Sequence, residues 1–163
     1  WQSLWENSMP GTKRIEQRNW DAPVCAEWVA AIEAAVAEAG PKVVIAAHSL
    51  ACIALAHWAQ QTKLSITGAL LVAPADAERP DFPAVARGFS PIPLQPLPFQ
   101  SIVVASTNDE YAAIERASYF ARCWGSRFVN AGAKGHINAA SGLGEWPEGA
   151  RLLKELVQNW PTL

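Results

Sequence analysis

The 163-residue sequence predicts an α/β fold, a parallel sheet with helices on both of its faces, in a single α/β-hydrolase-like domain over residues 1–163. Two observations lead to this prediction. Short apolar runs such as KVVIAA and SIVVAS are typical of strands that are buried on both faces. These runs alternate with longer segments whose apolar residues recur at helical spacing. Alternation of this kind is typical of parallel βαβ units.

The expected elements follow one another along the chain. Helices are expected over residues 1–7, 23–40, 50–61, 108–125 and 145–160, and strands over residues 13–17, 42–47, 68–73, 101–106 and 126–132. Glycines end two of these helices, and Pro147 fits the first turn of the last one. Residues 74–99 hold seven of the twelve prolines. A stretch of this length predicts a rigid surface connection or, alternatively, a cover over an active site.

Composition excludes several classes of protein. Half of the residues are apolar, the formal net charge is −2 and no segment concentrates Lys and Arg, so we expect no nucleic-acid or membrane partner. No run of 18 apolar residues is present. Cys25, Cys52 and Cys123 form no close pair and predict free thiols in a reducing compartment, the cytoplasm. No metal-ligand spacing or glycine-rich phosphate loop occurs, so no metal or cofactor is expected.

The segment AAHSLAC places Ser49 where a predicted strand turns directly into a helix. A serine at such a turn is held on a strained bend with its hydroxyl exposed above the sheet. The turn needs small residues two positions before and after it, and Ala47 and Ala51 occupy those positions. The sequence therefore indicates a nucleophile, with the N–H of Leu50 as an oxyanion donor. The alternative is a serine that only caps the helix.

A nucleophilic serine needs a base, and the chain contains three histidines. His136 follows the last predicted strand and Gly135, which places it at the carboxyl edge of the sheet, where ligands bind in open α/β sheets. His57 is expected well inside a helix. His48 directly precedes Ser49 and is expected to point to another side of the turn. His136 is therefore the favoured base.

Two aspartates follow predicted strands and could orient that base. Asp109 follows SIVVAS in a tight turn, and Asp76 follows GALLVA. We favour Asp109, because the next strand end carries His136 and neighbouring strand ends lie close together; Asp76 stays open as the alternative. The order Ser, Asp, His along the chain is that of the α/β-hydrolases.

The sequence resembles the small α/β-hydrolases typified by the retinoblastoma-binding serine hydrolase and the bacterial YdeN-type proteins. The resemblance covers almost the whole chain and rests on the segments WQSLWE, NWDAP, VVIAAHSLAC, LLVAPAD, FSPIPLQPLPFQSIVVASTNDEY and AGAKGHINAASGLGEWPEG. It implies a compact fold without a large lid domain, a triad of Ser49, Asp109 and His136, and machinery similar to that of esterases or peptidases. Some members of the family are linked to protein binding instead.

The sequence departs from the family pattern at two places. Ala51 stands where the family often has glycine. WQSLWE normally follows a first strand and a glycine-containing loop that supplies the second oxyanion N–H, and neither is present. Because a sheet without that strand would leave backbone groups unpaired beside the nucleophile strand, we expect the natural protein to continue upstream of Trp1.

The function expected from these features is that of a serine hydrolase, which cleaves a small ester, thioester or amide through an acyl-enzyme on Ser49. Its partner would be a small acyl substrate, and Trp20 and His48 are candidate substrate-binding residues. A protein-binding module with the same fold and little turnover is the alternative, with a protein as its partner. A purely structural domain is a third interpretation, and it would require the placement of the three residues to be coincidence.

Overall fold

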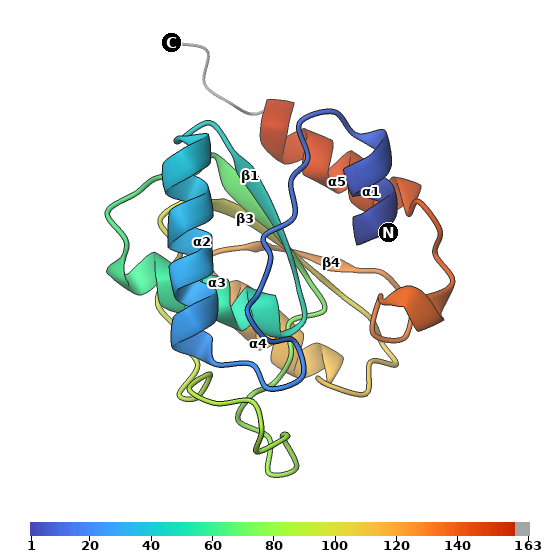
Figure 1. Ribbon diagram of the computed structural model, residues 1–163. Helices are drawn as coiled ribbons and strands as arrows, with labels where there is room; N and C mark the ends of the chain where they lie inside the picture. Colours follow the sequence, from blue (N-terminus) through green and yellow to red (C-terminus); the bar gives the residue numbers. More distant parts are fainter. Residues whose placement is uncertain (159–163) are drawn as a thin grey trace.

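Helices and strands alternate in the computed structural model, which describes residues 1–158 (Figure 1). The elements are α1 (Gln2–Ser8), α2 (Cys25–Ala39), β1 (Val44–His48), α3 (Leu50–Gln61), β2 (Gly68–Val72), β3 (Gln100–Ala105), α4 (Ile114–Trp124), β4 (Arg127–Asn130), the short 3₁₀ helix η1 (Ala139–Ser141) and α5 (Pro147–Gln158). None of the helices among these residues is long and apolar enough to cross a membrane. The order confirms the predicted α/β fold.

The four strands of the described chain form one parallel sheet in the order β1-β2-β3-β4. His48 pairs with Val72, Val72 with Val104, and Ala105 with Asn130. All four strands therefore end at the same edge, and the residues that follow them meet there. In this sheet β1 and β4 are the two edge strands. The strand expected upstream of Trp1 stays a prediction.

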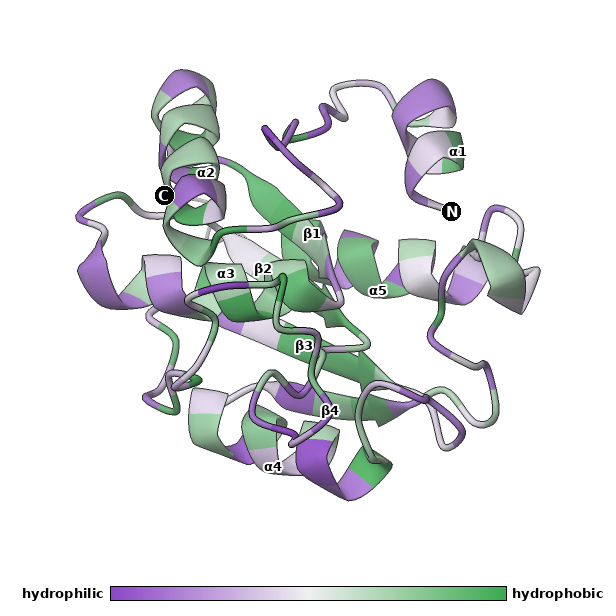
Figure 2. Cartoon of the chain, turned by 60° about the horizontal axis from the view of Figure 1, so that its bottom comes forward, coloured by the Kyte–Doolittle hydropathy of each residue, from purple (hydrophilic) through white to green (hydrophobic). Residues whose placement is uncertain are grey.

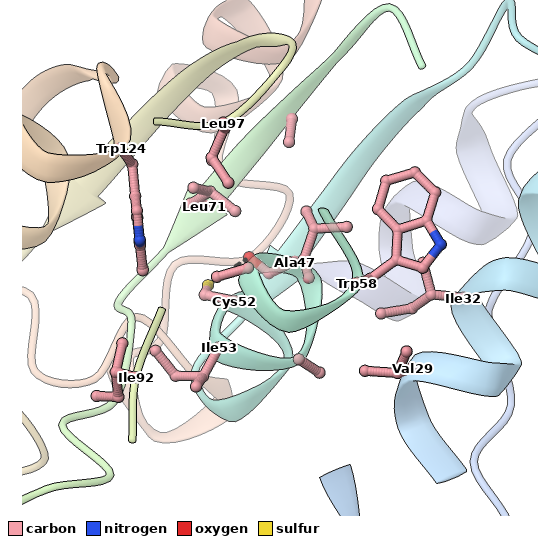
Figure 3. Close-up of a cluster of buried hydrophobic side chains, with 14 of the residues drawn as sticks. Val29, Ile32, Ala47, Cys52, Ile53, Trp58, Leu71, Ile92, Leu97 and Trp124 are labelled. Carbon is pink, nitrogen blue, oxygen red and sulfur yellow. Dashed lines mark hydrogen bonds between the residues drawn. The ribbon is translucent and has the colours of Figure 1, made fainter. Parts of the chain in front are cut away.

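Both faces of the sheet are covered, because successive side chains of a buried strand point to opposite sides. On β2, Ala69 and Leu71 join a first cluster with α2, α3 and α4, whereas Leu70 and Val72 join a second cluster with α1 and α5. Figure 3 shows Cys52 and Ile53 of α3 packed in the first cluster. In Figure 2 the strands are mostly green, and the covering helices carry purple as well as green residues. This arrangement explains why the strand runs are continuously apolar.

The prediction of a strand over residues 13–17 is wrong, because this segment is irregular in the structure. Its side chains bind neighbouring helices instead of pairing its backbone in the sheet. Lys13 donates to both carboxylate oxygens of Glu38, and Arg14 donates to Glu6. Ile15 packs against the first cluster. One apolar residue between charged neighbours gives too weak a pattern to specify a strand.

The helix expected from residue 108 begins only at Ile114. Residues 106–113 form a loop, in which the Asp109 carboxylate accepts a hydrogen bond from the Tyr111 backbone N–H at 2.8 Å. Asn and Asp side chains often bond to the backbone two residues further on, and this competes with helix formation. The delayed start of the helix leaves Asp109 in a turn above the sheet.

The other predicted elements are present, with ends that differ by a few residues. The helix expected over residues 145–160 begins at Pro147, and its expected end at Trp160 lies outside the described residues. Residues 74–99 contain no helix or strand and pack against α3 and α4 through Phe89, Ile92 and Leu97. The Trp124 indole also donates to the Pro93 carbonyl at 2.7 Å. These contacts favour the first of the two predicted roles for residues 74–99, a rigid surface connection, which here covers the first cluster.

Gly149 of α5 lies against the ring of Trp146, and a Cβ atom built at this glycine would come within 2.1 Å of that ring. We expect Gly149→Ala to lower the free energy of unfolding by about 1–3 kcal/mol, because the buried ring has to move. Urea denaturation measures the change. Lys154→Ala, at an exposed position of the same helix, is the control. Equal stability of the two variants would contradict the packing described for Trp146.

Candidate active site

The turn between β1 and α3 holds Ser49 in a strained conformation. Its φ of 57° and ψ of −122° are rare for a residue with a side chain. The Ser49 N–H donates to the Val72 carbonyl at 2.9 Å, which ties the turn to the end of β2. Ala47 is buried and Ala51 packs against the first cluster, so neither position has room for a large side chain. The local geometry is the one predicted for a nucleophile turn.

Ser49, His136 and Asp109 form a continuous chain of hydrogen bonds. Ser49 Oγ lies 2.7 Å from His136 Nε2, and His136 Nδ1 lies 2.9 Å from both carboxylate oxygens of Asp109. An ionised carboxylate can only accept, so the neutral imidazole carries its proton on Nδ1. Nε2 is then free to accept the proton of the serine hydroxyl. The side chains of His136 and Asp109 are only 7% and 3% exposed, so their hydrogen bond is shielded from water.

Ser106 and Asn108, which were not predicted as site residues, join two loops next to the hydrogen bonds of Ser49, His136 and Asp109. Ser106 Oγ donates to Asn108 Oδ1 at 2.8 Å and accepts from the Lys134 N–H at 2.9 Å. Asn108 Oδ1 also accepts from the Gly135 N–H at 2.7 Å. The loop that carries Asp109 is thereby tied to the loop that carries His136. The only sequence signal was the run of short polar residues in STND, which is typical of side-chain-to-backbone turns.

Asp76, the alternative acid, is engaged elsewhere. Its two carboxylate oxygens accept from the Nε and Nη2 atoms of Arg116 at 3.1 and 3.3 Å, in a bidentate pair. Arg116 also contacts Glu78. Asp76 thus connects the loop after β2 to α4, and the imidazole has Asp109 as its carboxylate partner.

Aromatic rings surround His136 on two sides. The ring of Tyr111 lies 4.3 Å from the His136 ring, measured between centroids, and that of His48 lies 4.8 Å away. His48 Nε2 is 2.8 Å from the carbonyl oxygen of His136. This bond favours a supporting role for His48 over the substrate contact expected from the sequence. Burial lowers the pKa of His48 to about 4, so its imidazole is neutral at pH 7.

The remaining predicted site residues lie at two places. Leu50 is the first residue of α3, so its N–H has no acceptor within the helix and is positioned beside Ser49. Trp20 lies against Trp28 of α2, with ring centroids 5.4 Å apart, and is 54% exposed. The structure therefore places Leu50 beside Ser49 and Trp20 against Trp28 of α2, and the use of Trp20 in substrate binding stays a prediction.

The three cysteines are free, and two of them are buried. Burial raises the pKa of the Cys25 thiol to about 11 and that of Cys52 further. Cys52, one turn after Ser49, is therefore a protonated packing residue of α3. Residues 1–158 contain no group of three or more His, Cys, Asp or Glu side chains that could hold a metal ion.

The geometry can be compared with known proteins. A family model described as serine hydrolase matches residues 1–155. The chain belongs to the serine hydrolase family. A protein described as a YdeN-like hydrolase, from Pectobacterium atrosepticum, is 35% identical with a TM-score of 0.84, over 97% of this chain and 82% of the other. No curated protein matches the sequence. The YdeN-type resemblance stated from the sequence is confirmed, and hydrolysis is the reaction class.

More distant structures share the fold. The ydeN gene product of B. subtilis is 15% identical with a TM-score of 0.74, over 88% of this chain and 81% of that chain. A Bacillus cereus carboxylesterase is 16% identical with a TM-score of 0.54, over 81% of this chain and 59% of that chain. These likenesses support the α/β-hydrolase fold.

The two aspartates can be separated by matched variants. Asp109→Asn should lower kcat for p-nitrophenyl acetate by about 10²–10⁴-fold, because an amide at this position stabilises the wrong tautomer of the imidazole. Asp76→Asn should leave kcat nearly unchanged and lower the thermal unfolding temperature, since it weakens the pair with Arg116. Steady-state kinetics and thermal denaturation of both variants check this. A larger loss of kcat in Asp76→Asn would contradict the assignment.

Proposed function

We propose that this protein is a serine hydrolase that cleaves small esters, thioesters or amides through an acyl-enzyme on Ser49. One observation carries the proposal: the unbroken hydrogen-bond chain from Ser49 Oγ through the imidazole of His136 to the carboxylate of Asp109. The half-buried position of Ser49 leaves its hydroxyl in reach of solvent, whereas the other two side chains are almost fully buried. This is the arrangement that nucleophilic catalysis by serine requires.

In the acylation half-reaction, Ser49 Oγ attacks the carbonyl carbon of the substrate and its proton passes to His136 Nε2. The imidazolium that results is stabilised by the negative charge of Asp109, 2.9 Å from Nδ1. The negative charge on the substrate oxygen would be met by the Leu50 N–H at the start of α3, where the helix dipole favours an anion.

The tetrahedral intermediate then breaks the bond between the carbonyl carbon and the leaving group, which takes the proton from His136 Nε2. Water attacks the acyl carbon of the ester on Ser49 in the second half-reaction, and His136 accepts a proton from that water. Return of this proton to Ser49 Oγ releases the acid and restores the enzyme. The transfers of the proton between Ser49 Oγ and His136 Nε2 use two groups that already lie in hydrogen-bonding contact.

A cytoplasmic location is part of the proposal, because free cysteines persist in a reducing compartment. The substrate would be a small acyl compound. The aromatic ring of Tyr111 beside the imidazole favours an acyl or leaving group with apolar surface.

A fluorophosphonate probe tests the proposal directly, because it phosphonylates only an activated serine. We expect stoichiometric labelling of Ser49 in the full chain, located by mass spectrometry, and no labelling in Ser49→Ala. Circular dichroism of the variant shows whether it is folded. Folded protein that takes no label would contradict the hydrolase proposal and favour the protein-binding alternative, for which a partner would then be sought.

A further inference from the structure

The loop that carries His136 has an unusual backbone. Ile137 has a φ of 50°, although its side chain is branched, and Gly135 has a φ of 57°. A branched residue in the left-handed region is strained and persists only where its surroundings hold it in place. The Ile137 side chain is fully buried in the second cluster. Packing fixes the side chain, and the backbone must be held by other contacts.

Two aromatic N–H groups hold consecutive carbonyls of this loop. His48 Nε2 lies 2.8 Å from the carbonyl oxygen of His136, and Trp1 Nε1 donates to the carbonyl oxygen of Ile137 at 2.8 Å. We propose that His48 and Trp1 are positioning residues, which keep the His136 imidazole aligned with Ser49 by holding these two carbonyls. This carbonyl clamp rests on the proposed function, because its purpose is the alignment of the base.

The tautomer of His48 follows from its partner. A carbonyl oxygen can only accept, so Nε2 must carry the proton of the neutral ring. Burial keeps the ring neutral, since the pKa of His48 falls to about 4. A neutral His48 also places no positive charge beside His136, which itself becomes cationic during acylation; the two ring centroids are only 4.8 Å apart. His48 can therefore support the base without opposing its protonation.

Trp1 is fixed in turn by an aromatic cluster that lies outside the sheet. Its ring lies 4.6 Å from that of Trp5 and 5.3 Å from that of Trp146, and Trp5 Nε1 donates to the Glu145 carbonyl at 2.6 Å. Trp1 also meets His48 edge to face at 6.1 Å. The segment with α1, beside α5 in Figure 1, thus braces the His136 loop from the second face of the sheet.

The chain offers a matched control for the clamp. His57 Nε2 also contacts a backbone carbonyl, that of Phe89 at 3.2 Å, in the loop over the first cluster. His57→Phe removes a comparable bond and should change stability only. His48→Phe and Trp1→Phe remove the two clamp bonds. His48→Gln keeps an N–H donor on a side chain of similar length and is the conservative variant.

The experiment measures kcat and KM for p-nitrophenyl acetate with the full chain, after fluorophosphonate titration of competent enzyme. We expect His48→Phe and Trp1→Phe to lower kcat by about 10-fold with little change in KM, because a base displaced by a fraction of an ångström transfers protons less well. His48→Gln should recover most of this loss, and His57→Phe should keep the full kcat. Full kcat in both His48→Phe and Trp1→Phe would overturn the clamp, as would His48→Gln no better than His48→Phe.

A second readout does not depend on turnover. The proton on His136 Nδ1, bound to Asp109, should give a resolved downfield NMR signal in the natural chain, in His48→Gln and in His57→Phe. The signal should broaden or vanish in folded His48→Phe. An unchanged signal in His48→Phe overturns the clamp even if the protein hydrolyses nothing. Absence of labelling and turnover in the natural chain, with the NMR pattern as expected, would contradict only the proposed function.

Discussion

The turn between β1 and α3 holds Ser49 at a φ of 57°, a conformation that costs a residue with a side chain about 1–3 kcal/mol. The turn persists because the sheet holds one end and the buried helix α3 holds the other. Ser49 N–H donates to Val72, and Cys52 and Ile53 are fully buried one turn later. The same turn directs the hydroxyl out of the sheet and places the Leu50 N–H at a helix start. The other side chains of the site, His136 and Asp109, are aligned with Ser49 Oγ.

The order of the strands places His136 far from Ser49 unless the chain turns back after β4. Ser49 follows β1 and His136 follows β4, and β2 and β3 lie between these two strands. Three strand spacings of about 4.8 Å separate the ends of these strands by about 14 Å. The chain after β4 must therefore turn back along the sheet edge to bring the imidazole to Ser49. Its path is held by Ser106 and Asn108 on one side and by the carbonyl clamp on the other.

The sequence predicts most of the helices and strands because the fold repeats one unit, a buried strand followed by a helix. Continuous apolar runs mark strands that helices cover on both faces, and a parallel sheet brings their carboxyl ends together. For this reason Asp109 and His136, which follow the neighbouring strands β3 and β4, could be paired from the sequence. The sequence leaves Asp76 open as an alternative to Asp109. In the structure Asp76 is paired with Arg116, which lies 40 residues further along the chain, and the His136 imidazole contacts Asp109.

Contacts between distant segments could not be predicted in the same way. Nothing in WQSLWE indicates that the Trp1 indole binds a carbonyl 136 residues away, and His48 carries no signal beyond its place next to Ser49. The late start of α4 depends on competition between the Asp109 side chain and the helix backbone, which helical periodicity does not report. The contacts of Trp1 and His48 with the loop of His136 are tertiary, whereas the late start of α4 is a local effect of the Asp109 side chain.

Rapid quenching of the reaction with p-nitrophenyl acetate, followed by peptide mass spectrometry, tests the central claim most directly. The account predicts a burst of p-nitrophenol equal to the concentration of active sites, together with one acetyl group on the peptide that contains Ser49. Turnover without an acetylated Ser49, or with the acetyl group on another residue, would contradict it, because the hydrogen-bond chain would then not serve a nucleophilic serine.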